Sequence, residues 1–265
     1  MAYNPFTDRK VTQVPLNEAI TLLDDNGQST FYVVRGTERA LIIDTANGYA
    51  DVLAYARQMT DLPLDVVNTH GHIDHILGNV YAEAAWLHPA DWALHDEMFR
   101  FPQVKAELEK YGKEPCPLRP LAIGQGFDLG GGLTLEVIPL PGHTAGSVGL
   151  LDRKHRILFT GDGLNCHCWM QLKESLPIEA LITTLEAVEA RWRKDYDYIL
   201  TGHAKGLEDA SATERLLACA RSLAAGDTAF DTPYEWFDGV CKFHRFPAPS
   251  GKGEGIVYGE SIPKA

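Results

Sequence analysis

A short run of the sequence holds four side chains that can bind a metal ion. His70, His72, Asp74 and His75 lie within residues 69–75, so one turn of backbone can present all four. Imidazole nitrogens and carboxylate oxygens are the ligands that suit zinc, iron and manganese. Crowding these groups together without a cation would be unfavourable. The run therefore predicts a metal site, with a solvated histidine-rich loop as the alternative.

Three further candidate ligands share a local context. His143, Asp162 and His203 each directly follow a glycine, and an apolar run precedes each of these turns. A similar run, residues 64–67, precedes the first histidines. Short β-branched or aromatic runs bounded by Gly and Pro are typical of strands. The sequence therefore predicts four strands that end in ligand-bearing turns, as expected at the carboxyl edge of the sheet in an α/β fold.

In their order along residues 20–210, these motifs resemble those of the metallo-β-lactamase superfamily. Residues 40–45 resemble the first motif of that family, whose aspartate, here Asp44, supports the metal loops. The resemblance implies an α/β fold of four layers, an αβ/βα sandwich of two mixed β-sheets with helices outside. Among its branches, the chain is most similar to glyoxalase-II-type enzymes and lactonases. β-Lactamases proper lack a carboxylate at the position of Asp162, and flavodiiron proteins have Glu where His72 stands.

The resemblance also implies two divalent metal ions, zinc first, with iron or manganese as alternatives. One ion would be held by His70, His72 and His143, the second by Asp74, His75 and His203, with Asp162 bridging them. Asp74 would act as both ligand and catalytic proton acceptor. Two bridged dications lower the pKa of a shared water to roughly 7, which supplies hydroxide as a nucleophile at neutral pH.

This chemistry predicts a metal-dependent hydrolase that uses a bridging hydroxide to cleave a small ester, thioester or lactone. A phosphodiesterase of the same fold would need the same ligands. A different alternative is a persulfide dioxygenase-like oxidoreductase, in which His70, His143 and Asp162 would hold a single iron. A metal-binding protein without turnover is a third, less favoured by the presence of Asp74.

The segments around the ligands suggest a substrate cleft. His167 and Trp169 follow Asp162 closely and are predicted to line the pocket. The adjoining Cys166 and Cys168 could hold a soft metal, but two cysteines so close rarely wrap one ion alone, so one is expected to pack as an apolar residue. Residues 85–120, rich in aromatic residues and proline, are predicted to form a lid or insertion beside the cleft, with Trp92 and Phe99 contacting substrate. A plain helical surface layer is the alternative. Residues 241–246 are expected to form a surface strand.

Length and composition limit the class of protein. The chain has 265 residues, 45% of them apolar, and no compositional break, so one domain spanning residues 1–265 is expected. A formal charge of −12 opposes binding to phosphate backbones, which argues for a small-molecule substrate and against nucleic acid.

No apolar stretch is long enough to cross a membrane, and the start does not resemble a signal peptide. The five cysteines contain no Cys-x-x-Cys pair, so free thiols and a cytoplasmic location are expected. A single sequence leaves the oligomeric state open.

The remaining pattern predicts the elements that carry the motifs. Residues 20–23, 31–34 and 41–43 read as successive strands ahead of the first ligands. Apolar residues at helical spacing predict three helices, at residues 48–60, 178–188 and 207–223.

Overall fold

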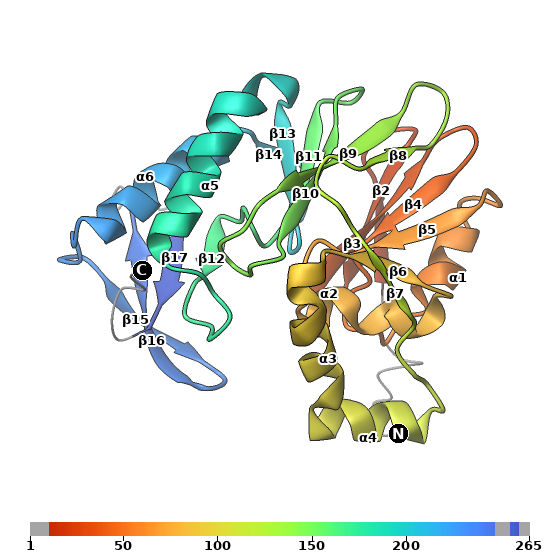
Figure 1. The fold of residues 1–265 in the computed structure, drawn as a ribbon, viewed down its shortest axis with the longest axis horizontal. Helices are drawn as coiled ribbons and strands as arrows, with labels where there is room; N and C mark the ends of the chain where they lie inside the picture. The colour runs from red at the N-terminus through yellow and green to blue at the C-terminus, as the bar shows by residue number, and fades with distance from the viewer. Residues whose placement is uncertain (1–10, 247–254, 260–265) are drawn as a thin grey trace.

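The computed structural model describes residues 11–246 and 255–259. Two mixed sheets form its centre, with helices on their outer sides (Figure 1). The first sheet has seven strands in chain order: β1 (Val11–Pro15), β2 (Ile20–Asp25), β3 (Ser29–Arg35), β4 (Ala40–Ile43), β5 (Leu64–Val67), β6 (Ala85–Leu87) and β7 (Leu118–Pro120). The predicted opening strands are thus confirmed as an antiparallel meander.

The second sheet has six strands in the order β14-β13-β11-β10-β9-β8. Its members are β8 (Gly126–Asp128), β9 (Thr134–Pro139), β10 (Val148–Asp152), β11 (Ile157–Gly161), β13 (Tyr198–Thr201) and β14 (Glu208–Asp209). A core of buried Leu, Ile, Val and Phe side chains from both sheets fills the space between them. The strands of this core are buried almost along their whole length, as β3 and β11 illustrate, because each face is covered by another layer.

Within the described residues, six α-helices and three short 3₁₀ segments complete the two halves. The elements α1 (Val52–Arg57), α2 (Ile73–Ile76), η1 (Leu77–Tyr81), η2 (Pro89–Asp91), α3 (Trp92–Arg100) and α4 (Pro102–Lys110) lie on the side of the first sheet, whereas α5 (Ile178–Arg191), η3 (Arg193–Asp195) and α6 (Ala212–Ala224) belong to the other half (Figure 1). The amphipathic stripes of α5 and α6 pack on the second sheet through residues such as Leu185 and Leu216. The αβ/βα sandwich predicted for the chain is the fold observed.

A third sheet was not predicted. It has the order β12-β17-β16-β15 and joins β12 (His167–Trp169) to β15 (Thr232–Trp236), β16 (Gly239–Arg245) and β17 (Gly255–Tyr258). The expected surface strand at residues 241–246 is part of β16. The sheet depends on the parallel pairing of β12 with β17, which lie far apart in the chain. Local patterning of a three-residue strand cannot reveal such a partner.

Two predicted helices start later than expected, for reasons visible in their caps. The helix expected at 48–60 begins at Val52, because the Asp51 side chain accepts a hydrogen bond from the amide of Ala54 and so caps it. The helix expected at 207–223 begins at Ala212, since Glu208 and Asp209 pair with β13 as strand β14. Among the described residues, no helix is long and apolar enough to span a membrane.

Candidate metal centre

All seven candidate ligands come together where the carboxyl ends of strands from both sheets meet. Three sets of ligand atoms lie within 4.8 Å of one another among the described residues: His70, His72 and His143; His70, His75 and Asp162; and Asp74, His75 and His203. The first run follows β5, and His143, Asp162 and His203 follow β9, β11 and β13. The first and third sets are the two ligand groups that the family resemblance implies. Their role as ligands stays a prediction.

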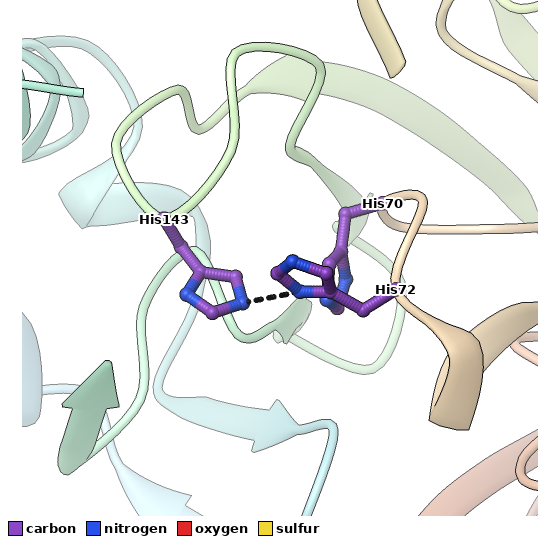
Figure 2. A group of neighbouring side chains, drawn as sticks. All are labelled: His70, His72 and His143. Atoms are coloured by element: carbon purple, nitrogen blue, oxygen red, sulfur yellow. Dashed lines mark hydrogen bonds between the residues drawn. The ribbon is translucent and has the colours of Figure 1, made fainter. Parts of the chain in front are cut away.

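The first set shows how closely the rings converge. His143 approaches from the loop after β9, opposite His70 and His72, which come from the turn leading into α2 (Figure 2). The Nε2 atom of His143 lies 2.8 Å from Nδ1 of His72. The ring of His70 stands edge-on to the ring of His143, with centroids 5.0 Å apart. All three side chains are buried.

Main-chain carbonyls determine which ring nitrogen faces the centre. The carbonyl oxygen of Trp169 lies 2.7 Å from Nδ1 of His143, and the carbonyl oxygen of Gln28 lies 2.6 Å from Nδ1 of His203. A carbonyl can only accept a hydrogen bond, so both Nδ1 atoms donate. In a neutral ring the Nε2 atom then carries a lone pair, directed toward the other ligands.

The other three histidines are held in the same way. His72 places Nε2 2.6 Å from Oε1 of Glu174, and His75 places Nδ1 3.1 Å from Oδ2 of Asp44. His70 places Nδ1 3.1 Å from the Thr69 hydroxyl. That hydroxyl donates its own proton to Asp44, so it accepts from His70. Each outer nitrogen is therefore a donor, and in a neutral ring each inner nitrogen is left as an acceptor.

This arrangement fits a cation. The facing nitrogens of His72 and His143, 2.8 Å apart, would both be acceptors if both rings are neutral, and a positive charge between or beside them would then remove the repulsion. The inner Nε2 atoms of His70 and His75 are buried and make no hydrogen bond within the described structure, although Oδ2 of Asp74 lies 3.3 Å from Nε2 of His75. Outer-nitrogen hydrogen bonds of this kind are what orient histidines that bind metals.

Asp162 stands between the two sets. Its Oδ2 atom lies 3.2 Å from Nε2 of His203, 3.7 Å from Nε2 of His75 and 3.9 Å from Nε2 of His143. One carboxylate oxygen thus faces ligands of both implied ions, which is the position a bridge would need. Asp74 lies on the outer side, with Oδ2 3.5 Å from Nε2 of His203 and a side chain that is 29% exposed.

The charges of the ligands separate into two groups. Burial, with repulsion from neighbouring histidines, holds the pKa of His70 well below its usual value and lowers the pKa of His143 to about 4. Burial also opposes charge on His75 and His203, but the nearby carboxylates outweigh it, so the pKa of His75 is raised and that of His203 rises to about 9. Burial acts against the charge of Asp162 as well, yet His203 and His75 hold its pKa well below the usual range. Protons on His75 and His203 therefore occupy the places where a cation fits.

Asp44 supports this centre as the sequence predicted. Its carboxylate accepts hydrogen bonds from the amide of Thr69 at 2.7 Å and from the Thr69 hydroxyl at 2.8 Å, besides the ring of His75. The residue adopts a left-handed backbone conformation, with φ of 60°. Such a conformation is uncommon for a residue other than glycine and is typical of functional sites.

Two supporting carboxylates were missed by the sequence reasoning. Glu174 lies outside every motif, in the loop between β12 and α5. The buried Asp91 accepts hydrogen bonds from the amides of Gly71 and Gly146, and from the hydroxyl of Thr144. It thereby ties the turn after β5 to the turn after β9. No local pattern marks either residue, because each acts on partners distant in the chain.

His167 and Trp169, the predicted pocket residues, lie beside the centre. Trp169 contributes the carbonyl that holds His143. Burial and then repulsion from Arg245 and His203 lower the pKa of His167, whose ring stacks on Phe243. Its Nε2 atom is buried and makes no hydrogen bond within the described structure. Whether these residues line a substrate pocket stays a prediction.

Comparison with known proteins identifies the family. The model of the metallo-beta-lactamase superfamily matches residues 24–203. The chain belongs to the metallo-β-lactamase superfamily. Solved structures of this superfamily share its fold: a metallo-beta-lactamase from Pontibacter korlensis has a TM-score of 0.61 and 18% identity, covering 80% of this chain and 99% of its own. The DIM-1 metallo-beta-lactamase has a TM-score of 0.60 and 20% identity, covering 81% and 98%.

Curated relatives in the superfamily carry an enzyme name. The acyl-coenzyme A thioesterase MBLAC2 of Gallus gallus is 31% identical over 163 residues, which is 52% of this chain and 58% of the relative. The protein of the same name from Homo sapiens is 27% identical over 166 residues, which is 52% of this chain and 59% of the relative. The matches thus span less than two thirds of these relatives.

The lid predicted at residues 85–120 consists mainly of α3 and α4. Phe99 is buried in a small core with Ile76 and Leu94, and the indole nitrogen of Trp92 donates to the carbonyl of Leu87. Phe99 therefore packs in this core, while contact of Trp92 and Phe99 with substrate stays a prediction. An ion pair between Glu97 of α3 and Lys173 connects this layer to the loop that carries Glu174. A role as lid stays a prediction.

The cysteine run does not form a further metal cluster among the described residues. Cys168 is fully buried in the core beneath α5 and α6, where burial raises the pKa of its thiol well above the usual value, while Cys166 is exposed. The two thiols therefore lie in different environments. Cys168 packs as the small apolar residue that the sequence suggested.

Proposed function

We propose that this chain is a metal-dependent hydrolase that cleaves an acyl thioester at a binuclear centre, with zinc as the metal. The observation that carries the proposal is the orientation of the five histidines, whose outer nitrogens all donate to acceptors and whose inner nitrogens all face Asp162 or one another. A site of this kind suits two dications better than one, since Asp162 faces both ligand sets.

The choice of thioester over ester or lactone rests on the relatives. Thioester and lactone cleavage were both expected for the glyoxalase-II and lactonase branch that the motifs resemble. The name acyl-coenzyme A thioesterase on several relatives favours the thioester. Because they match over little more than half of their length, their substrate is a hypothesis for this chain.

The protein's own residues would bind, orient and exchange protons. His70, His72 and His143 would hold one ion, and Asp74, His75 and His203 the other. Bound dications would polarise a thioester carbonyl and supply hydroxide at neutral pH. Nε2 of His203 lies 3.5 Å from Oδ2 of Asp74 and 3.2 Å from Oδ2 of Asp162, so His203 helps to position both carboxylates. The attraction of His75 and His203 outweighs the effect of burial and holds the pKa of Asp74 low, so Asp74 is a carboxylate at neutral pH, with a side chain that is 29% exposed to solvent.

The first experiment measures metal content and activity together. Protein purified without added metal is analysed by plasma mass spectrometry and assayed on a thioester, a lactone and a phosphodiester. We expect near two zinc ions per chain and turnover of the thioester. Turnover of only the lactone or the phosphodiester would replace the proposed substrate class.

A His203→Ala variant separates the binuclear proposal from the mononuclear iron alternative. Of the two implied ions, His203 would hold only the one bound by Asp74, His75 and His203, so its loss should lower the metal content toward one ion and thioester turnover by about 100-fold or more. In a persulfide dioxygenase, His70, His143 and Asp162 would hold the iron, so the His203→Ala variant would keep its iron and its oxygen uptake. That result, together with about one iron per chain in the parent protein, would overturn the proposed hydrolase function.

A further inference from the structure

The C-terminal sheet has two faces of different character. One face places Cys168, Ile256 and Tyr258 in the core shared with α5 and α6. The other face forms a separate cluster drawn entirely from the strands of this sheet: Trp169, Tyr234, Trp236, Cys241, Phe243 and Val257. In the described part of the chain, no helix contributes to this second cluster, which we call the aromatic face.

The rings of the aromatic face are in contact from one end to the other. His167 stacks on Phe243 with centroids 4.8 Å apart. Trp169 meets Trp236 edge-on at 5.7 Å, and Trp236 contacts Phe237 at 4.6 Å. Gly255 makes the first of these contacts possible, because a Cβ atom there would lie 2.1 Å from the ring of Phe243. The cluster is therefore continuous, but its middle is covered, since Val257 is 0% and Phe243 7% exposed, whereas Trp169, Tyr234 and Trp236 are partly exposed.

One end of the aromatic face adjoins the candidate metal centre. The carbonyl of Trp169 holds the ring of His143, and His167 follows Asp162 by one short turn. The other end is the β15–β16 hairpin, which projects away from the helices of its half (Figure 1). Trp169 of β12 reaches across the sheet, so that its ring centroid lies 5.7 Å from that of Trp236 and 6.4 Å from that of Phe237. The partly exposed rings therefore lead directly from the residue that holds His143 to the hairpin.

The far end exposes apolar side chains to solvent. Among the large apolar residues that the structure describes, Phe237 is 87% exposed and Phe230 72%. They lie within eight residues of sequence, at and near the hairpin. Clustered exposure of this kind marks binding surfaces rather than ordinary surface variation.

The charged residues around the aromatic face indicate which part of a thioester it would bind. The guanidinium of Arg245 lies 4.8 Å from the ring centroid of Phe243, near the end closest to the centre. The hairpin carries the acidic residues Glu235 and Asp238 instead. A polyanionic nucleotide arm would meet repulsion there, whereas an uncharged hydrocarbon arm would not.

We propose that the aromatic face binds the acyl chain of the thioester substrate, with the reacting end beside His167 and the methyl end toward Phe237. This proposal rests on the proposed thioesterase function. Each methylene that leaves water on such a surface favours binding by about fourfold. Affinity should therefore rise with chain length until the face is covered.

The test compares acyl chains of different length on hairpin variants. Acetyl, hexanoyl and dodecanoyl thioesters of one thiol are assayed with the parent protein, Trp236→Ala and Phe237→Ala. Val240→Ala is the matched control, since strand alternation turns Val240 to the opposite side of the hairpin from Cys241 and Phe243. We expect kcat/KM for dodecanoyl to fall about tenfold more than for acetyl in the Trp236 and Phe237 variants, mainly through KM. Val240→Ala should not discriminate between chain lengths.

A binding measurement separates this inference from the proposed function. Dodecanoate is titrated into the full chain by calorimetry, without any turnover. One outcome is that dodecanoate binds at least about tenfold more weakly to Trp236→Ala than to the parent protein, while the parent protein hydrolyses no thioester. This would support acyl-chain binding by the aromatic face and overturn the proposed thioesterase function. If the parent protein hydrolyses thioesters and the hairpin variants lose the same fraction of kcat/KM for every chain length, the aromatic face does not bind the acyl chain, and the proposed thioesterase function is unaffected. A shift from dimer to monomer in Phe237→Ala, without chain-length effects, would also overturn acyl-chain binding by the aromatic face, because the hairpin would then be a contact between copies.

Discussion

Each histidine ring in the candidate centre is oriented by the acceptor bound to its outer nitrogen. Two of these acceptors are main-chain carbonyls, which no side-chain substitution removes. The acceptor for His72 is different, since Glu174 is a side chain from a separate loop, 2.6 Å from Nε2. Burial opposes the charge of Glu174, but the hydrogen bond to His72 outweighs it and lowers the pKa of the carboxyl, so a carboxylate accepts from the ring.

Replacing Glu174 should weaken metal binding without removing a ligand. We expect Glu174→Ala to lower metal affinity by about 10- to 100-fold, because the ring of His72 loses its orientation and some basicity. Glu174→Gln should lose less, since an amide oxygen can still accept the bond. Affinity is measured by competition with a chromogenic chelator. Glu179→Ala, an exposed position at the start of α5, is the control. Equal affinity of all variants would show that Glu174 does not position His72.

The raised pKa of His203 predicts how the chelated protein responds to pH. The folded pKa is about 9 against an ordinary value of 6.5, so the folded state binds this proton more tightly than the unfolded state. The resulting stability is fully present below pH 6.5 and is lost as the pH rises through 9. In EDTA, the urea midpoint should therefore fall between pH 7 and pH 9.

His203→Asn supplies the comparison for this pH effect. The variant should show a shallower fall, with the remainder due to His75, whose pKa is also raised. Excess metal should remove the fall in the parent protein, because the ion takes the place of the protons. A chelated parent protein that gains stability toward pH 9 would contradict the assignment of charge in the centre.

The turn after β13 shows how closely an element must approach the ligands. A Cβ atom on Gly202 would lie 2.4 Å from Cε1 of His75 and 2.6 Å from Oδ1 of Asp162. Contacts that short are not tolerated, so one of the two side chains would have to move. Gly202 is therefore needed for the turn and also because it has no side chain where His75 and Asp162 lie.

Gly202→Ala should disrupt the set formed by Asp74, His75 and His203 in particular. We expect a loss of about 1–3 kcal/mol in stability from overpacking and a lower metal content, measured by urea unfolding and plasma mass spectrometry. Gly206→Ala is the matched control, because a Cβ there would meet nothing within 4 Å. Two variants with the same metal content would mean that the turn can relax without moving His75 or Asp162.

Elements whose sequence pattern is local were predictable, and elements that depend on distant partners were not. The strands before the first ligands and the stripe of α5 follow from apolar periodicity alone. The start of α6 was misplaced because pairing with β13 overrides the helical pattern of Glu208 and Asp209. The third sheet, Glu174 and Asp91 were missed because their partners are distant in the chain. The family resemblance supplied the grouping of the ligands, which spacing could not have given.

At the scale of the whole molecule, the candidate centre joins the two halves of the sandwich. The run His70–His75 follows the first sheet, whereas His143, Asp162 and His203 follow strands of the second. Without a cation, the contact between these groups includes the facing acceptors of His72 and His143. Bound ions would replace that repulsion with bonds that cross between the halves, so they should stabilise the assembled fold.

Metal removal should therefore lower global stability by an amount that depends on metal concentration. A ligand that binds only the folded state adds about 2.7 kcal/mol at 100 times its Kd, so the melting temperature should rise steadily with free zinc after chelation. His143→Ala, which removes a ligand of the second sheet, should flatten this dependence, measured by calorimetry across a zinc series. Hydrogen exchange should show protection gained in the turns after both β5 and β13. Protection confined to one sheet would show that the ions stabilise a single loop and do not link the halves.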